Sequence, residues 1–316
     1  MIVVVSLNPA LDITHHVDGV DWAGVNRPAE VRAGPGGKGL NVAMTLHALG
    51  AGVMLLGLAG GITGAAIRSR LRASGVAFRL TEIEDDTRRT FAVVDTRRGQ
   101  VAMFNEPGPA VTPGEYSRFL AAYKEALTAC TTVVLTGSLP GGLAGDTYAG
   151  LIRIAASAGV PAVLDTSGDP LLKGLAAGPA IVKPNLAELA QVAGGDADWS
   201  SPPGQPAVLA SAAELRHRGA DAVVVSMSAD GLLAVTGAGT WHAVAPAVDG
   251  NPTGAGDAVV AALAQGLTRG SSWPVRLAEA AALGAAAAAA PAAGEFLDED
   301  LARARAGVRV TDLEHA

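Results

Sequence analysis

Residues 251–257 read Asn-Pro-Thr-Gly-Ala-Gly-Asp and lead directly into the apolar run Ala258–Leu263. The apolar run predicts a helix, so the glycine loop lies at a helix N-terminus, where free N–H groups and the helix dipole bind phosphate. Glycine also lets the backbone approach a ligand closely, because it has no Cβ. A carboxylate in this anion site, Asp257, suggests a base that deprotonates a hydroxyl while Gly254–Gly256 holds a phosphoryl group. An ordinary first-turn helix carboxylate is the alternative interpretation.

A second glycine cluster, residues 34–39 (Gly-Pro-Gly-Gly-Lys-Gly), precedes another predicted helix start. It satisfies G-x-G-x-x-G, but the acidic residue that a dinucleotide fingerprint needs about 20 positions later is missing. The Walker pattern fails too, since Arg32 replaces its first glycine and Gly39 its Ser or Thr. What remains is a backbone-rich loop with Lys38 and Asn41, suited to hydroxyls and a phosphate. A plain loop with a solvated lysine is the alternative.

Apolar runs of strand length alternate with helical stretches along the chain. The candidate strands are Ile2–Val5, Val53–Gly57, Val133–Thr136, Ala162–Leu164, Ile181–Val182 and Ala222–Val225. Their near-continuous hydrophobicity indicates burial on both faces, as in a parallel sheet covered by helices. Helices are expected after Gly39, Gly64, Pro113, Asp146, Asn185, Pro206 and Gly256. The alternation predicts an α/β fold with a doubly wound, mostly parallel sheet flanked by helices.

Composition and charge narrow the class of protein. The single cysteine, Cys130, excludes an internal disulfide and suits a reducing, cytoplasmic location. We expect no signal peptide, because the chain begins directly with a strand-like run. The apolar run Ala280–Ala293 is shorter than the roughly 20 residues of a membrane span, so it predicts a buried helix and no membrane partner. A net charge of −7 argues against a nucleic-acid partner.

Short blocks of sequence occur in an order and spacing that resemble the ribokinase-like (PfkB) carbohydrate kinases. The blocks are Ser6–Asp12, Gly36–Ala43, Asp86–Arg88, Gly137–Pro140, Asp165, Lys183–Glu188 and Gly254–Asp257. Within that family they are most similar to the hexose-phosphate branch, typified by 1-phosphofructokinase. The resemblance spans essentially the whole chain. It implies the ribokinase-like fold and an ATP-dependent kinase.

Residues 12–32 and 88–106 depart from the core pattern. Their short alternating stretches predict a sheet with one wet face, and we expect a small β-lid over a core made of residues 1–11, 33–87 and 107–316. The resemblance implies the same lid, which in relatives often forms a dimer clasp, so a homodimer through the lid is expected. A lid that excludes water prevents phosphoryl transfer to water.

Sugar and phosphate ligands are expected beyond the carboxyl ends of the strands. Asp12 can accept hydrogen bonds from sugar hydroxyls, and Asn41 can donate and accept them. A turn aspartate after Pro9 and an ordinary helix-start amide are the alternative interpretations. The resemblance assigns Arg88 to the substrate phosphate, which an arginine binds bidentately, with Lys38 and Ser138 beside it. An ordinary surface ion-pair cluster is the alternative for Arg88, since residues 82–86 are rich in acids.

Asn185 and Glu188 lie three residues apart at a predicted helix start, so their side chains face the same way. One amide and one carboxylate suit a hydrated Mg²⁺ bound with ATP, although a solvated helix face explains Glu188 as well. The family's Asn-x-x-Glu pattern favours magnesium. The family's Ser-x-Gly-x-x-Gly nucleotide pattern appears as residues 226–231, with Ser228 in place of a glycine. A monovalent cation is also found near this region in relatives.

These observations lead to one functional hypothesis with alternatives. We expect ATP-dependent phosphorylation of a sugar phosphate, first of all fructose 1-phosphate to fructose 1,6-bisphosphate. A tagatose-6-phosphate or fructose-6-phosphate kinase, a neutral-sugar kinase and a non-catalytic sugar-phosphate-binding regulator stay open. The assigned residues are Asp257, Gly254, Ala255 and Gly256 for catalysis; Asp12, Gly36, Gly37, Lys38, Asn41, Arg88, Ser138 and Asp257 for the sugar phosphate; Lys183, Asn185, Ser226, Ser228, Gly231, Gly254 and Gly256 for ATP; and Asn185 and Glu188 for Mg²⁺.

Overall fold

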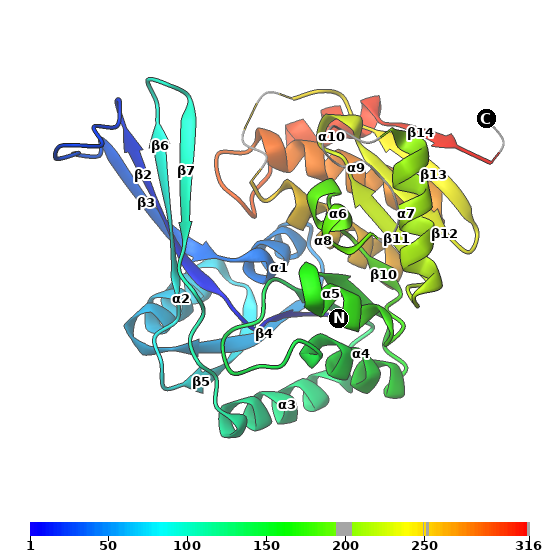
Figure 1. Ribbon diagram of the computed structural model, residues 1–316, viewed down its shortest axis with the longest axis horizontal. Coiled ribbons are helices and arrows are strands. Elements are labelled where there is room, and N and C mark those ends of the chain that lie inside the picture. Colours follow the sequence, from blue (N-terminus) through cyan, green and yellow to red (C-terminus); the bar gives the residue numbers. More distant parts are fainter. Residues whose placement is uncertain (194–203, 249, 251–252, 315–316) are drawn as a thin grey trace.

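A computed structural model describes residues 1–193, 204–248, 250 and 253–314. Residues 251 and 252, which begin the approach to the first glycine loop discussed above, lie outside the described residues. In the part that is described, helices and strands alternate along the chain, as the apolar runs predicted (Figure 1).

A ten-stranded, mostly parallel sheet forms the centre of the molecule (Figure 1). Its strands, in the order in which they lie side by side, are β14 (Arg309–Asp312), β13 (Gly239–Val244), β12 (Leu232–Thr236), β11 (Ala222–Ser226), β10 (Ile181–Val182), β9 (Ala162–Asp165), β8 (Thr132–Thr136), β1 (Ile2–Ser6), β4 (Val53–Gly60) and β5 (Ala77–Ile83). The strands from β11 to β5 are parallel, and β12, β13 and β14 add an antiparallel edge.

Helices cover both faces of this sheet. They are α1 (Lys38–Ala48), α2 (Gly61–Ser74), α3 (Pro113–Leu127), α4 (Thr147–Ser157), α5 (Gly168–Leu175), α6 (Leu186–Val192), α7 (Gln205–His217), α8 (Ala255–Thr268), α9 (Trp273–Ala289) and α10 (Asp298–Gly307). In β1, Ile2 and Val4 belong to the core under α1, α8 and α9, whereas Val3 and Val5 belong to the core under α3, α4 and α7. Burial on both faces therefore explains the continuous apolar strands, and the predicted fold class is confirmed.

The sequence did not reveal every element. The predicted elements did not include β5, the antiparallel β12–β14 edge, α5 or α10. Strands β5 and β13 carry mixed polar patterns, whereas β12 is as apolar and buried as the strands that were predicted. The buried alanine-rich helix was expected over Ala280–Ala293, but α9 runs from Trp273 to Ala289 and ends before Pro291, whose ring cannot continue a helix. Among the described residues, none of the helices has both the length and the apolar character to cross a membrane.

A second, four-stranded sheet stands to one side of the main sheet (Figure 1). Its strands, in spatial order, are β3 (Glu30–Gly36), β2 (Ala10–Val17), β6 (Arg89–Asp95) and β7 (Gln100–Asn105). These come from the two segments expected to form a lid, but β2 begins at Ala10 and β3 ends at Gly36, so both strands run into the segments assigned to the core. The division into lid and core stays a prediction.

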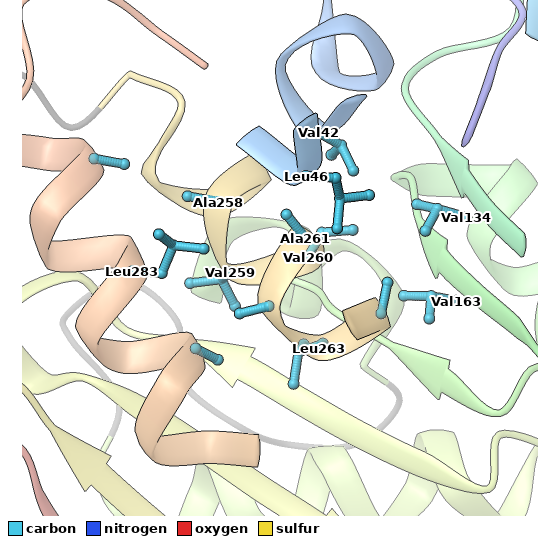
Figure 2. Packing of buried hydrophobic residues seen from close by; sticks show 14 of the residues in the cluster. Val42, Leu46, Val134, Val163, Ala258, Val259, Val260, Ala261, Leu263 and Leu283 are labelled. Atoms are coloured by element: carbon cyan, nitrogen blue, oxygen red, sulfur yellow. The ribbon is translucent and has the colours of Figure 1, made fainter. Parts of the chain in front are cut away.

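Helix α8 is packed between α1 and α9 through small side chains. Figure 2 shows Val259 of α8 next to Leu283 of α9, with Val260 and Ala261 on the side of Leu46 of α1. All α8 residues from Asp257 to Ala264 are buried. A Cβ on Gly284 of α9 would lie 2.9 Å from Val259 Cγ2, so glycine is what allows the two helices to approach this closely. Small side chains in α9 therefore fix the position of α8 and of the carboxylate at its start.

We predict that Gly284→Val destabilises the protein by about 2 kcal/mol, because extra atoms between α8 and α9 overpack a close contact. Gly150→Ala in α4 is the matched control, since a Cβ there meets nothing within 4 Å. That change should stabilise the fold by about 0.5–1 kcal/mol through helix propensity alone. Urea unfolding of both variants measures the difference. Equal stability of the two variants would contradict the packing argument.

Candidate active site

Asp165 ends strand β9 and is the centre of a buried ionic cluster. Its carboxylate lies 3.4 Å from Nζ of Lys183 and 3.3 Å from Nζ of Lys38, and it accepts a 2.9 Å hydrogen bond from Oγ1 of Thr136. Burial opposes ionisation of this carboxyl, but attraction by Lys183 and Lys38 outweighs it, and the pKa of Asp165 lies below its ordinary value. Asp165 is therefore a fixed negative charge at the carboxyl edge of the sheet.

Lys38, at the start of α1, connects Asp165 with the first turn of α6. Its Nζ donates a 3.0 Å hydrogen bond to Oε1 of Glu188. Burial disfavours the charged form, but Asp165, Glu188 and Asp257 together raise the pKa of Lys38 above its ordinary value. The lysine is thus a cation paired with two carboxylates, with 36% of its side chain exposed.

Asn185 and Glu188 form a reciprocal cap at the start of α6. The backbone N–H of Glu188 donates to Oδ1 of Asn185 at 2.8 Å, and the N–H of Asn185 donates to Oε2 of Glu188 at 2.9 Å. Each of the two predicted metal ligands therefore already has a structural hydrogen bond to the backbone of the other. Whether they also hold Mg²⁺ stays a prediction.

Asp257 lies in the first turn of α8 and is buried. Nδ2 of Asn41, from the first turns of α1, donates a 2.8 Å hydrogen bond to Oδ2 of Asp257. Burial, reinforced by repulsion from Asp165, raises the pKa of Asp257 to about 7, against the stabilising effects of Asn41, Lys38 and Lys183. Asn41 thus contacts the candidate base, a role that the sequence did not suggest. A carboxyl with this pKa can accept a proton near neutral pH.

The loop before Asp257 requires a glycine at position 254. Gly254 caps α8 with φ +88°, and a Cβ there would also collide with Ala293. A Cβ on Gly256 would lie 3.7 Å from Nζ of Lys183, so the lysine ammonium stands beside the loop. With Ala255 as the first residue of α8, the loop presents the free N–H groups of a helix start beside a buried cation.

A cavity of about 560 Å³ opens between the lid and the main sheet. Lys38, Glu188, Ser138 and Arg88 all line it, so four predicted site residues converge there. Asp12, Asn41, Asp257 and the nucleotide residues do not line it. Lys38 connects the cavity to Asp257, since it lines the first and interacts with the second.

Arg88 is held in this cavity by backbone carbonyls. Its Nε donates to O of Asn8 at 3.2 Å and its Nη1 to O of Glu106 at 3.5 Å. No carboxylate of the described residues lies within 4 Å of its guanidinium, whereas neighbouring Arg89 pairs with Glu106 at 2.8 Å. Burial lowers the pKa of Arg88 from its ordinary value, with Asp12 and Glu106 opposing the shift. Arg88 is therefore not part of a surface ion-pair cluster.

Asp12 lies on β2 at the base of the lid. Its carboxylate accepts hydrogen bonds from Oγ1 of Thr90 on β6 and from the N–H of Gly37. A Cβ on Gly36 would overlap the carboxylate, so the glycine makes room for it. Burial raises the pKa of Asp12, and Thr90, Arg88 and Gly37 oppose the shift. Asp12 therefore ties the lid to the second glycine loop.

Residues 226–231, which we expect to bind the nucleotide, lie beside Asn185. The N–H of Ser226 donates to O of Pro184 at 3.0 Å, next to a bridge between Ser226 and Asn185. Ser228 has φ 53°, and among the described residues it is the one non-glycine residue with positive φ. Gly231 has φ +84° and no room for a Cβ against O of Ala243. The serine at 228 therefore adopts the left-handed conformation that a glycine adopts without strain.

Sequence reasoning gave no role to two residues that shape the site. Asp165 is one of the positions that resemble the PfkB family, but its location between Lys38 and Lys183 depends on the fold. Asn8 lines the cavity, and its Nδ2 donates to Oγ of Ser138 at 3.0 Å, while its Oδ1 is buried without a hydrogen-bond partner among the described residues. The available signal for Asp165 was a carboxylate directly after the apolar run Ala162–Leu164, and for Asn8 it was a polar residue in the loop after the first strand.

Comparison with known proteins gives a consistent result. The family model "pfkB family carbohydrate kinase" matches residues 3–299. The chain is 37% identical to ATP-dependent 6-phosphofructokinase isozyme 2 of Mycobacterium tuberculosis (strain H37Rv), covering 96% of this chain and 88% of that protein. It is 38% identical to 1-phosphofructokinase of Rhodobacter capsulatus, covering 90% of each.

Solved structures agree in fold. Phosphofructokinase-2 of Escherichia coli in complex with potassium superposes with a TM-score of 0.87 at 28% identity, covering 96% of this chain and 98% of that one. The same enzyme in complex with fructose-6-phosphate gives a TM-score of 0.85 at 29% identity, with the same coverage. The matched blocks, the two-sheet architecture and these relatives together place the chain in the pfkB family of carbohydrate kinases.

Proposed function

We propose that this protein transfers the γ-phosphoryl group of ATP to a hydroxyl of a sugar phosphate, with fructose 1-phosphate as the first candidate acceptor. The observation that best supports this proposal is the Asp257 carboxyl, which is buried at the start of α8, where a helix N-terminus can bind an anion. Its pKa of about 7 suits a general base. The named relatives include a 1-phosphofructokinase and a 6-phosphofructokinase, so fructose 6-phosphate is the second candidate. Tagatose 6-phosphate is a third acceptor.

Asp257 is positioned for proton transfer by its neighbours. Asn41 holds one carboxylate oxygen, which leaves the other available to a substrate hydroxyl. The N–H groups of Gly254, Ala255 and Gly256, with Lys183 beside them, would stabilise negative charge on the transferring phosphoryl group. Phosphoryl transfer depends mainly on positioning and electrostatics, so this anion site contributes along with the base.

The cavity beside the lid suits a phosphorylated acceptor. Arg88 has its guanidinium charge unpaired by any described carboxylate within 4 Å, and Ser138 and Lys38 lie on the same cavity wall. An arginine fork binds a phosphate through two parallel hydrogen bonds. Asn8, which lines the same cavity, then remains for a hydroxyl of the sugar, while Asp12 stays a predicted sugar ligand outside the cavity lining. A kinase for a neutral sugar has no use for Arg88 in this position.

The acidic end of α6 fits a hydrated magnesium ion rather than a closed metal cage. The described residues contain no cluster of three or more His, Cys, Asp or Glu side chains able to hold a metal. Mg²⁺ commonly keeps several waters and binds through one or two carboxylates plus substrate phosphates, which Glu188 and Asn185 allow. When bound, the ion would neutralise charge on the ATP phosphates. Ser226, Ser228 and Gly231 are proposed to contact ATP.

Two further expectations extend this proposal. Because a solved structure of the E. coli relative contains potassium, a monovalent cation near the glycine loop is a proposal for this chain too.

The outer strands of the lid expose Val31, Val101, Met103 and Phe104, each more than half exposed, which supports a homodimer through the lid. Light scattering that gives the mass of one chain would overturn the dimer.

Replacement of the base tests the function itself. Asp257→Asn keeps the volume and an acceptor for Asn41 but cannot take a proton, so kcat should fall by roughly 10²–10⁴-fold with an unchanged fold. ADP release with Mg·ATP is measured on fructose 1-phosphate, fructose 6-phosphate, tagatose 6-phosphate, fructose and ribose. Activity confined to fructose or ribose would refute the choice of a phosphorylated acceptor. Near-normal turnover of the variant would refute the base.

The pH profile reports the state of Asp257. In the free enzyme kcat/KM should rise with pH to a plateau, with a midpoint near 7, as this carboxyl ionises. Asn41→Ala removes a hydrogen bond that favours the carboxylate, so the midpoint should move to higher pH. The substrate phosphate also titrates near pH 6, but it is the same in both enzymes, so the shift isolates the protein group. An unchanged midpoint in Asn41→Ala would exclude Asp257 as the titrating base.

The same carboxyl affects stability. Its folded-state pKa lies above the unfolded value, so the folded state binds the extra proton between about pH 4 and 7. Asp257 therefore lowers the free energy of unfolding progressively as pH rises through that window. Asp165 has the opposite effect. Because its pKa is lower in the folded state than in the unfolded state, it stabilises the fold at pH values above its unfolded-state pKa, and this contribution is lost as the pH falls.

Arg88→Gln tests recognition of the acceptor phosphate. Loss of a charge-assisted hydrogen-bond donor should weaken binding of the sugar phosphate by about 2 kcal/mol. This lowers kcat/KM roughly 30-fold, mostly by raising KM. Arg97→Gln is the matched control, since Arg97 lies in the turn after β6 and pairs with Asp18 on the surface at 3.1 Å. Equal effects of the two changes would show that Arg88 acts only through general charge.

A further inference from the structure

A second cavity, of about 570 Å³, lies at the opposite edge of the main sheet from Asp165. It is lined by the last turn of α8 at Leu267, by the first turn of α9 at Trp273 and Arg276, and by Arg216 of α7. Helix α8 begins at the candidate active site and ends here, and its 14 residues span about 20 Å. This cavity is therefore separate from the site of phosphoryl transfer.

Arg276 is a buried cation without a matching anion. The residue is 7% exposed, and among the described residues its Nε has no hydrogen-bond partner and no carboxylate lies within 4 Å of its guanidinium. One Nη donates to O of Ser271 at 2.9 Å, and the guanidinium lies 4.5 Å above the ring centre of Trp273. A Cβ on Gly266 would lie 2.7 Å from Cγ of Arg276, so glycine makes room for this buried stem. A buried charge left unpaired is unfavourable, which a bound anion would correct.

The surroundings add positive potential. Arg216 also lines the cavity; its Nε donates to the backbone O of Asp221 at 3.0 Å, and it forms no ion pair with a described carboxylate within 4 Å. Helix α9 has no acidic residue in its first turn and no side-chain cap on Ser272, so its positive dipole end is not compensated. The carbonyls at the end of α8 accept hydrogen bonds from the N–H groups of residues 269–271.

One acidic side chain opposes this arrangement. Asp221 lines the cavity as well, but it is exposed, whereas Arg276 is buried. The lining thus carries two guanidinium groups against one solvated carboxylate. Guanidinium pairs bind phosphate oxygens bidentately, and the cavity volume lies within the range of small-molecule sites.

We propose that this cavity, built by Arg216, Arg276 and the start of α9, is a second anion site that binds the phosphate group of a small phosphorylated molecule. The site is independent of the proposed acceptor site at Arg88. The shared chemistry is a phosphate oxyanion, from either inorganic phosphate or an organic phosphate.

Calorimetry in the Arg88→Gln background tests this, because it weakens the proposed acceptor-phosphate site. Inorganic phosphate is titrated first and fructose 1-phosphate second. Arg216→Gln should weaken phosphate binding about 10-fold or more, and Arg276→Met should abolish it. Arg79→Gln, which removes an exposed arginine paired with Glu125, is the matched control and should bind phosphate with unchanged affinity.

The outcomes separate the possibilities. Tighter binding of fructose 1-phosphate than of phosphate, sensitive to Arg216, identifies an organic phosphate as the ligand; equal affinities identify the phosphate group alone. If Arg276→Met does not fold, Arg216→Gln decides the question. The proposal is overturned if neither ligand binds in the Arg88→Gln background, or if the affinity is the same in Arg216→Gln as in Arg79→Gln.

Discussion

The carboxylate of Asp165, held between Lys38 and Lys183, is the interaction on which the site depends. It joins the end of β9, the residue after β10 and the first residue of α1 inside the protein, where removal of one partner would leave buried charges unpaired. Its negative charge also contributes to the raised pKa of Asp257. One carboxylate therefore pairs with both lysines and, together with burial, raises the pKa of the candidate base.

Packing of α8 determines where that base stands. The helix is buried along most of its length between α1 and α9, and alanine and glycine at the contacts keep the distances short (Figure 2). Asn41 and Asp257, which are 216 positions apart in sequence, meet because α1 and α8 both start at the carboxyl edge of the sheet. Core packing of α1 against α8 and the hydrogen bond from Asn41 to Asp257 thereby bring the starts of the two helices together.

The sequence predicts best where local pattern and burial agree. Ile2–Val5 and Ala222–Val225 are parallel strands because both faces are buried, and the glycines at 254 and 256 mark a helix start because of backbone geometry. It predicts poorly where long-range pairing decides. Nothing local to Lys38 indicates Asp165 and Glu188 as partners, and nothing in Asn41 indicates Asp257. The edge strand β14 is likewise placed by its pairing with β13, because its own sequence is short and mostly exposed.

The charge balance of the cluster explains why further cations are needed. Lys38 and Lys183 carry two positive charges, and Asp165, Glu188 and ionised Asp257 carry three negative ones, which leaves one net negative charge. A proton on Asp257 below about pH 7 makes the cluster neutral. Neither state attracts two phosphorylated substrates by itself. Under the proposed function, that negative charge would be balanced by groups outside the cluster, namely Arg88, the N-terminus of α8 and the magnesium ion proposed to accompany ATP.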